Sequence, residues 1–227
     1  MNKTDVSVLL PCLNEEKGVG ICISKIKKVF VEEKINGEII VIDNGSTDNT
    51  VKVAASFNDV KIILEPKKGY GYAYLAGFCE TIGDIIIMGD ADNSYDFYDI
   101  PRFLKELENA DFVIGNRKYI SKNSSPPLHR YIGRPVFSIL LRWLFHLNIS
   151  DSHCGYGAIK KESLDKLNLK STGMELASEI LIKAKENHLI ISEIPIKYSP
   201  RLGKSKLRTF SDGSRHLKLI AYEFLRQ

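Results

Sequence analysis

The 227-residue sequence has few of the features that mark specialised classes of protein. No run reaches the roughly 18 to 20 apolar residues of a membrane-spanning helix, and the nearest, Tyr131 to Ile149, is interrupted by arginines. The net charge of +4 is too small to indicate nucleic acid as a partner. No signal-peptide pattern precedes the first apolar run, and no paired spacing relates the cysteines, which are Cys12, Cys22, Cys79 and Cys154. We therefore expect free thiols in a reducing, cytosolic environment.

The residues that are present, 44% hydrophobic and 26% charged, are typical of a soluble globular protein, and we expect one domain over residues 1–227. Short β-branched runs alternate with amphipathic stretches, which is typical of βαβ units. The predicted fold class is therefore α/β, with a Rossmann-like, mainly parallel sheet flanked by helices. We expect a basic amphipathic C-terminal region that ends in a helix starting near Asp212. Strands are expected at residues 6–11, 38–43, 60–65, 84–90, 111–116 and 189–199.

Polar residues follow four of the predicted strands. In parallel α/β sheets, ligands bind outside the carboxyl ends of the strands. The four clusters at residues 11–15, 43–48, 90–94 and 116–117 should therefore converge on one edge of the sheet. This edge is the predicted site.

The cluster after the predicted strand 84–90 is acidic. Asp90 and Asp92 stand two residues apart at the end of an apolar run, where a buried carboxylate needs a positive partner. Mg²⁺ and Mn²⁺ take oxygen ligands, few of them from protein and the rest from water and substrate phosphates. A divalent cation is one interpretation, and an acidic turn open to solvent is the other.

A second group of charges in the later half of the chain is basic. Arginine binds phosphate with a planar fork, although solvated surface charge is the alternative interpretation. The apolar, arginine-containing stretch from Tyr131 is either core or a surface that rests on a membrane. The basic residues are Arg117, Arg130, Arg134, Arg142, Arg201, Lys204, Lys206 and Arg208. For His153 and Cys154, a buried structural role is favoured over zinc binding or nucleophilic catalysis, because no second Cys/His pair has suitable spacing.

Six ordered motifs carry a family resemblance that covers nearly the whole chain. They are "VLLPCLNEE", "VIDNGSTDNT", "GDADNSYDF", "IGNR", "DSHCGYGAIKK" and "IPIKYSPRLGKSKL". In these motifs the sequence resembles the inverting GT-A glycosyltransferases of family two, and within them the polyprenyl-phosphate sugar transferases typified by dolichol-phosphate mannosyltransferase. The resemblance implies a GT-A fold, in which residues 1–116 bind a nucleotide sugar and residues 117–227 bind the acceptor.

The resemblance also implies a role for individual residues. Asp92 is a direct metal ligand, with Asp90 and Ser94 beside it, although the family often has Gln at the position of Ser94. Asp92 and Arg117 are the expected catalytic residues. The nucleotide-sugar site comprises Pro11, Leu13, Glu15, Asp43, Asp90, Ala91, Arg201 and Lys206. The acceptor-phosphate site comprises Arg117, Arg130, Arg134 and Ser138.

The implied reaction moves a hexose from a nucleoside-diphosphate sugar to a dolichyl or undecaprenyl phosphate, with Mg²⁺ or Mn²⁺ as cofactor. A phosphate monoester has a second pKa of about 6, so this nucleophile is ionised near neutral pH and requires no general base. The expected location is the cytoplasmic face of a membrane, with or without a membrane-anchoring partner protein.

Three other functions stay open from the sequence. A family-two enzyme of cell-surface glycan synthesis that uses a hydroxyl acceptor would need a carboxylate base, for which Glu175 or Glu179 would have to serve. A catalytically inactive nucleotide-sugar-binding subunit is disfavoured by the intact Asp90, Asp92 and Arg117. A nucleotidyltransferase fits the pairing of "GSTDNT" with "RLGKSKL" poorly.

Overall fold

The structure, a computed structural model, describes residues 5–121, 124, 134–203 and 209–226. The strands in this part of the chain are β1 (Val6–Cys12), β2 (Gly37–Asp43), β3 (Val60–Leu64), β4 (Ile85–Met88), β5 (Phe112–Ile120), β6 (Gly157–Lys160) and β7 (Ile191–Tyr198). The helices are α1 (Val19–Glu32), α2 (Thr50–Ala55), α3 (Tyr70–Cys79), the 3₁₀ helix η1 (Phe97–Asp99), α4 (Ile100–Glu106), α5 (Arg134–Phe145), α6 (Lys161–Leu164), α7 (Leu176–Glu186) and α8 (Thr209–Phe224).

The strands form one seven-stranded sheet in the order β3-β2-β1-β4-β6-β5-β7. Strands β3, β2, β1 and β4 pair in parallel, and so do β5 and β7. Strand β6 lies between β4 and β5 and is antiparallel to both. The mixed but mainly parallel sheet confirms the predicted fold class, and all six predicted strands are present within a few residues of their expected bounds.

Strand β6 is missing from the sequence-based assignment. It has only four residues, three of them buried, so it is too short to show the period-2 alternation that identifies a strand. Its position follows from the space between β4 and β5, where both neighbours supply backbone hydrogen-bonding partners. The consequence for the site is large, because β6 brings the residues just before it, 151–156, to the edge where β4 ends.

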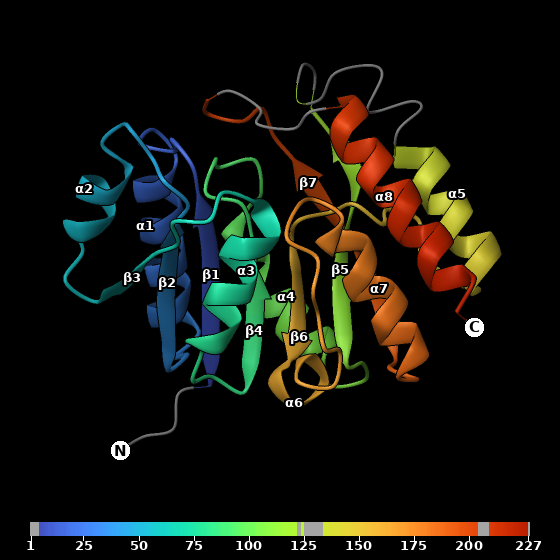
Figure 1. The fold of residues 1–227 in the computed structure, drawn as a ribbon. Helices are drawn as coiled ribbons and strands as arrows, with labels where there is room; N and C mark the ends of the chain where they lie inside the picture. The colour runs from blue at the N-terminus through green and yellow to red at the C-terminus, as the bar shows by residue number, and fades with distance from the viewer. Residues whose placement is uncertain (1–4, 122–123, 125–133, 204–208, 227) are drawn as a thin grey trace.

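The core lies on both faces of the sheet. In β1, Val8, Leu9 and Leu10 are fully buried, which is typical of a central parallel strand covered on both faces. Burial of each such side chain contributes about 1.5 to 3 kcal/mol. Figure 1 shows α3 and α7 in front of the sheet, with α1 and α4 behind it. Helices α5 and α8 lie side by side beyond β7, at the end of the molecule that carries the C-terminus (Figure 1).

Candidate active site

The acidic segment begins where β4 ends. After Gly89, whose N–H donates to the Leu9 carbonyl, the chain turns through Asn93 in the left-handed region, with φ 61°. Asp92 is 3% exposed, and its Oδ1 accepts the N–H of Ser94 at 2.9 Å. The backbone of Ala91 approaches Gly18 so closely that a Cβ at Gly18 would lie 2.3 Å from the Ala91 carbonyl oxygen. The loop before α1 therefore fixes this acidic turn.

Two arginines act on the acidic segment from the second half of the chain. Burial raises the pKa of Asp90 to about 7, and the charge of Asp92 adds to this, while Arg201 and Arg117 act in the opposite direction. Arg201 Nη1 lies 3.4 Å from Asp92 Oδ2, and its Nη2 donates to the Tyr198 hydroxyl at 3.2 Å. The segment after β7 is held there because Leu202 N–H donates to the Asp92 carbonyl at 2.9 Å.

The oxygens in this segment suit a divalent cation. Ser94 Oγ is buried and has no hydrogen-bond partner in the described residues, and Asp92 Oδ2 lies 3.4 Å from Arg201 Nη1. Among the described residues, no three His, Cys, Asp or Glu side chains gather as a metal site. A cation here would therefore use one or two carboxylates, the serine and the phosphates of a substrate, which is the usual way in which Mg²⁺ binds.

The predicted nucleoside residues lie where β1 and β2 end. Asp43 is 5% exposed, and its Oδ2 accepts the N–H groups of Gly45 and Ser46 at 3.2 and 3.1 Å. The N–H of Glu15 donates to Thr50 Oγ1 at 2.8 Å, which ties the end of β1 to α2. Pro11 and Leu13 are half-buried beside them. The structure thus gathers these residues, and their contact with a base stays a prediction.

Asn44 is a residue of this region that the sequence analysis missed. Its amide nitrogen donates to the carbonyls of Glu65 and Lys67 at 3.0 and 2.8 Å, and its Oδ1 accepts the N–H of Gly69 at 2.7 Å. Asn44 therefore shapes the loop before α3. The signal was its place beside Asp43 in "DNGSTD", where an asparagine can satisfy the backbone of a neighbouring loop.

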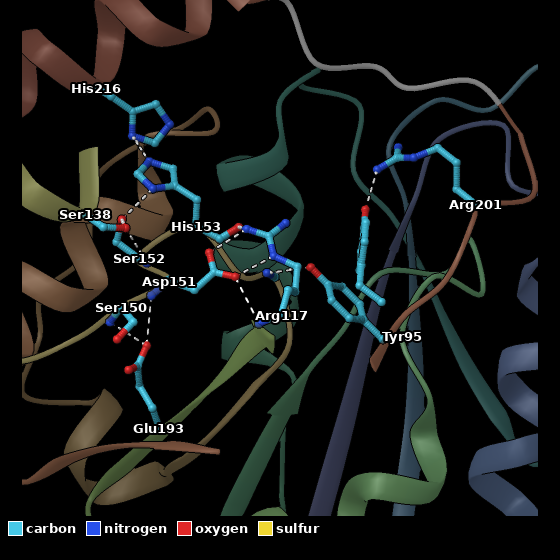
Figure 2. A network of polar contacts seen from close by, with 12 residues as sticks. Tyr95, Arg117, Ser138, Ser150, Asp151, Ser152, His153, Glu193, Arg201 and His216 are labelled. Atoms are coloured by element: carbon cyan, nitrogen blue, oxygen red, sulfur yellow. Dashed lines mark hydrogen bonds and ion pairs between the residues drawn. The ribbon is translucent and has the colours of Figure 1, made fainter. Parts of the chain in front are cut away.

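Arg117 in β5 is held by a buried acid. Its Nε and Nη2 donate to the two carboxylate oxygens of Asp151, each at 2.7 Å, and Nη2 also donates to the His153 carbonyl at 2.8 Å (Figure 2). The ring of Tyr198 lies 5.3 Å from the guanidinium carbon. Burial opposes the charge, but Asp151 prevails and raises the pKa of Arg117 further above its usual range, so the side chain stays cationic.

The other predicted acceptor residues have different outcomes. Ser138 in α5 is 4% exposed, and its Oγ accepts the N–H of Ser152 at 3.1 Å and lies 3.0 Å from Ser152 Oγ. These contacts give Ser138 a role in holding the loop before β6. Arg134 begins α5, but its side chain lies outside the described part of the structure, as do Arg130 and Lys206. Their contact with phosphate stays a prediction.

The two candidate bases for a hydroxyl acceptor both hold the backbone or another charge. Glu179 is 3% exposed and accepts the N–H groups of Lys170 and Ser171. Glu175 pairs with Arg215 at 2.6 Å and accepts the N–H of Gly173 at 3.2 Å. These bonds give both acids a structural role in the loop that precedes α7.

The cysteines have no disulfide partners in the structure, as the sequence predicts. All four cysteines are free, and Cys154 is buried. Burial raises the pKa of Cys154 to about 12, so its thiol is protonated near neutral pH and is a poor nucleophile. The next residue, Gly155, lies against the side chain of Asp90. A Cβ at this position would lie 3.2 Å from both carboxylate oxygens of Asp90, so glycine leaves space for that carboxylate.

Comparison with known proteins gives one family and a set of relatives. The model of the family "Glycosyl transferase family 2" matches residues 7–167. A low-salt glycan biosynthesis hexosyltransferase, Agl6 of Haloferax volcanii, is 40% identical over 220 residues, which are 95% of this chain and 52% of that protein. The chain thus spans about half the length of this relative. A dolichyl-phosphate hexose transferase of the same organism is 28% identical over 212 residues, covering 92% of this chain and 90% of that protein.

Solved structures support the fold. Glucosyl-3-phosphoglycerate synthase from Mycobacterium tuberculosis, in complex with Mn²⁺, UDP-glucose and phosphoglyceric acid, superimposes with a TM-score of 0.78 at 20% identity. The match covers 97% of this chain and 80% of that chain. This match and the family model confirm the GT-A fold. The family model and the two relatives from Haloferax confirm the resemblance to the dolichyl-phosphate sugar transferase branch that the six motifs predict.

Proposed function

Because the chain belongs to glycosyl transferase family 2, we propose that it transfers a hexose, with inversion, from a nucleoside-diphosphate sugar to a polyprenyl phosphate such as dolichyl or undecaprenyl phosphate. One observation carries the proposal: Arg201 lies 3.4 Å from Asp92 at the sheet edge that holds the acidic segment, and the charge of Arg117 also acts on the buried Asp90 there. The named activity of the dolichyl-phosphate relative supports this choice of acceptor.

The donor occupies the first half of the site. The residues at the ends of β1 and β2 hold the nucleoside, with Asp43 at the base. The diphosphate lies between the acidic segment and Arg201, which is already within 3.4 Å of Asp92. Asp90, Asp92 and Ser94 would hold a Mg²⁺ or Mn²⁺ ion, which would supply positive charge to the departing diphosphate.

The acceptor phosphate lies on the side of Arg117. A phosphate monoester is largely a dianion near neutral pH, so an oxygen of the acceptor attacks the anomeric carbon without giving up a proton to the protein. Arg117 then has to hold the dianion and orient it, and its buried position strengthens the interaction. The Glu179 carboxylate is taken up by backbone N–H groups, which fits this mechanism, because it needs no general base. In Glu175, Oε1 pairs with Arg215, while Oε2 is buried and has no hydrogen-bond partner among the described residues.

We place the acceptor at a membrane surface, on the cytoplasmic side. Helix α5 exposes Val136, Ile139 and Trp143, a stripe with helical spacing in which Trp143 is 76% exposed. The neighbouring α8 exposes Leu217, Tyr222 and Phe224 together with basic side chains. An apolar face with flanking cations is suited to the surface of an anionic bilayer. Within the described residues, no helix is long and apolar enough to cross the bilayer.

A comparison of two acceptors tests the proposal. The purified protein is incubated with Mn²⁺, a panel of nucleoside-diphosphate hexoses and either a short polyprenyl phosphate or the matching unphosphorylated polyprenol, and products are identified by mass. Loss of a charge-assisted contact of about 1.5 to 3 kcal/mol corresponds to roughly ten- to hundredfold slower transfer, which is the advantage expected for the phosphate. Equal rates with the two acceptors would contradict the phosphate-nucleophile mechanism.

A further inference from the structure

The contacts of Arg117 leave one part of its guanidinium available. Two of the three nitrogens, Nε and Nη2, are engaged by Asp151 and the His153 carbonyl. The third, Nη1, donates no hydrogen bond within the described part of the chain, and Tyr198 lies over the guanidinium. Asp151 and the His153 carbonyl together form a clamp on Arg117. This clamp fixes which edge of the guanidinium faces a ligand.

We propose that Asp151 is a positioning residue for the transfer reaction: it holds Arg117 so that Nη1 meets the phosphate of the acceptor. The inference rests on the proposed function, in which Arg117 binds a phosphomonoester. An arginine side chain loses rotamer entropy when it binds a ligand, and a contact that has already fixed the side chain removes that cost from the binding step. The same fixing gives the attacking oxygen a defined direction.

Asp151 is itself positioned from outside its own loop. Glu193 in β7 accepts the N–H groups of Ser150 and Asp151 at 2.8 and 2.9 Å (Figure 2). The N–H of the next residue, Ser152, donates to Ser138 Oγ in α5 at 3.1 Å. The clamp is thus tied to β7 and to α5, which explains why a loop can hold a buried acid at a fixed place.

A second tie joins the clamp to α8. The Nε2 atom of His153 lies 3.2 Å from Nδ1 of His216, and the same Nδ1 lies 2.8 Å from Ser178 Oγ in α7. The carbonyl of His153 is the group that accepts from Arg117. The contact at His153 therefore fixes the loop on the side opposite Glu193 (Figure 2).

A purely structural ion pair is the alternative explanation. Asp151 is 1% exposed, and a buried pair of charges is often no more stabilising than a pair of apolar side chains of the same volume. Stability alone therefore gives little reason to keep both charges in the core. Presenting a cation at the edge of the sheet is a task that an apolar pair would not perform.

The first experiment compares Asp151→Asn with Glu223→Gln, which removes a buried acid that pairs with Lys183 at 2.7 Å, away from Arg117. Both variants are assayed at saturating donor with a short, water-soluble polyprenyl phosphate. We expect a ten- to hundredfold higher acceptor KM for Asp151→Asn, with the affinity for nucleotide sugar unchanged. Asp151→Glu should recover part of the loss, and Glu223→Gln should match the wild type. An unchanged acceptor KM in Asp151→Asn overturns the inference.

The second experiment asks whether Asp151 acts through Arg117. In a double-mutant cycle, Arg117→Ala and the double variant Arg117→Ala with Asp151→Asn should have the same acceptor use, because the clamp has nothing left to hold. Independent, multiplying losses would overturn the inference. Thermal unfolding of each variant separates this effect from a loss of folded protein.

A panel of acceptors distinguishes a wrong acceptor assignment from a wrong role for Asp151. The wild type is tested with polyprenyl phosphate and with 3-phosphoglycerate. A higher KM of Asp151→Asn for whichever of the two is used supports the inference, and the acceptor that is used shows which kind of phosphomonoester the enzyme binds. Transfer to 3-phosphoglycerate but not to polyprenyl phosphate rejects the proposed acceptor and keeps the positioning role. Transfer only to unphosphorylated acceptors overturns both.

Discussion

His216 should make the stability of the protein depend on pH. The side chain lies in α8 and is 4% exposed, with its ring against Phe137 of α5 and His153. Burial lowers its pKa to about 4, while the charges of Glu175 and Asp212 act to raise it and Arg215 acts with burial. The imidazole is therefore neutral in the folded protein at physiological pH.

The sign and size of the effect follow from linkage between protonation and folding. The unfolded chain binds a proton at His216 with a pKa of about 6.5, so stability is fully present above that pH and is lost as the pH falls toward about 4. At about pH 5, the unfolded state is mostly protonated and the folded state is not. The difference corresponds to a loss of about 2 kcal/mol in the free energy of unfolding.

Urea unfolding at about pH 7.5 and about pH 5 measures this loss. The wild type is compared with His216→Phe, which keeps an aromatic ring against Phe137 but has no titrating group. Groups that do not contact His216 titrate equally in the two proteins, so the wild type should lose about 2 kcal/mol more than the variant between the two pH values.

The control is His188→Asn, at an exposed histidine with φ 57°, a conformation that asparagine tolerates. It should behave as the wild type does. Equal losses in wild type and His216→Phe would refute the reasoning.

Two further predictions concern the proposed site and surface. Asp92→Asn should remove most transfer activity while leaving the melting temperature nearly unchanged, because asparagine still accepts the N–H of Ser94. Full activity of that variant, or of the wild type in excess chelator, would exclude a metal role for Asp92. In flotation with anionic vesicles at low salt, the protein should rise with the lipid, and Trp143→Ser should reduce the bound fraction. Protein that stays at the bottom of the gradient would contradict docking through α5 and α8.

The sequence by itself determined the acidic segment and every strand of the described sheet except β6. Strand β1 is apolar at nearly every position and β4 ends directly before Gly89 and Asp90, so local hydrophobic patterning was enough to locate both. The convergence of the polar clusters on one edge followed from parallel strand order, because ligands bind at the carboxyl ends of such sheets. These are properties of short segments, and short segments can be identified without knowledge of their neighbours.

Only the tertiary structure decided which residues hold Arg117 and its neighbouring loop in place. Asp151 is 34 residues from Arg117, and His153 is 63 residues from His216, so no periodic pattern links the members of either pair. They meet because antiparallel β6 enters the sheet between β4 and β5 and carries the loop before it to the end of β4. A buried acid is stable only where its partner already lies, and that place depends on the order of the strands rather than on the sequence near the acid.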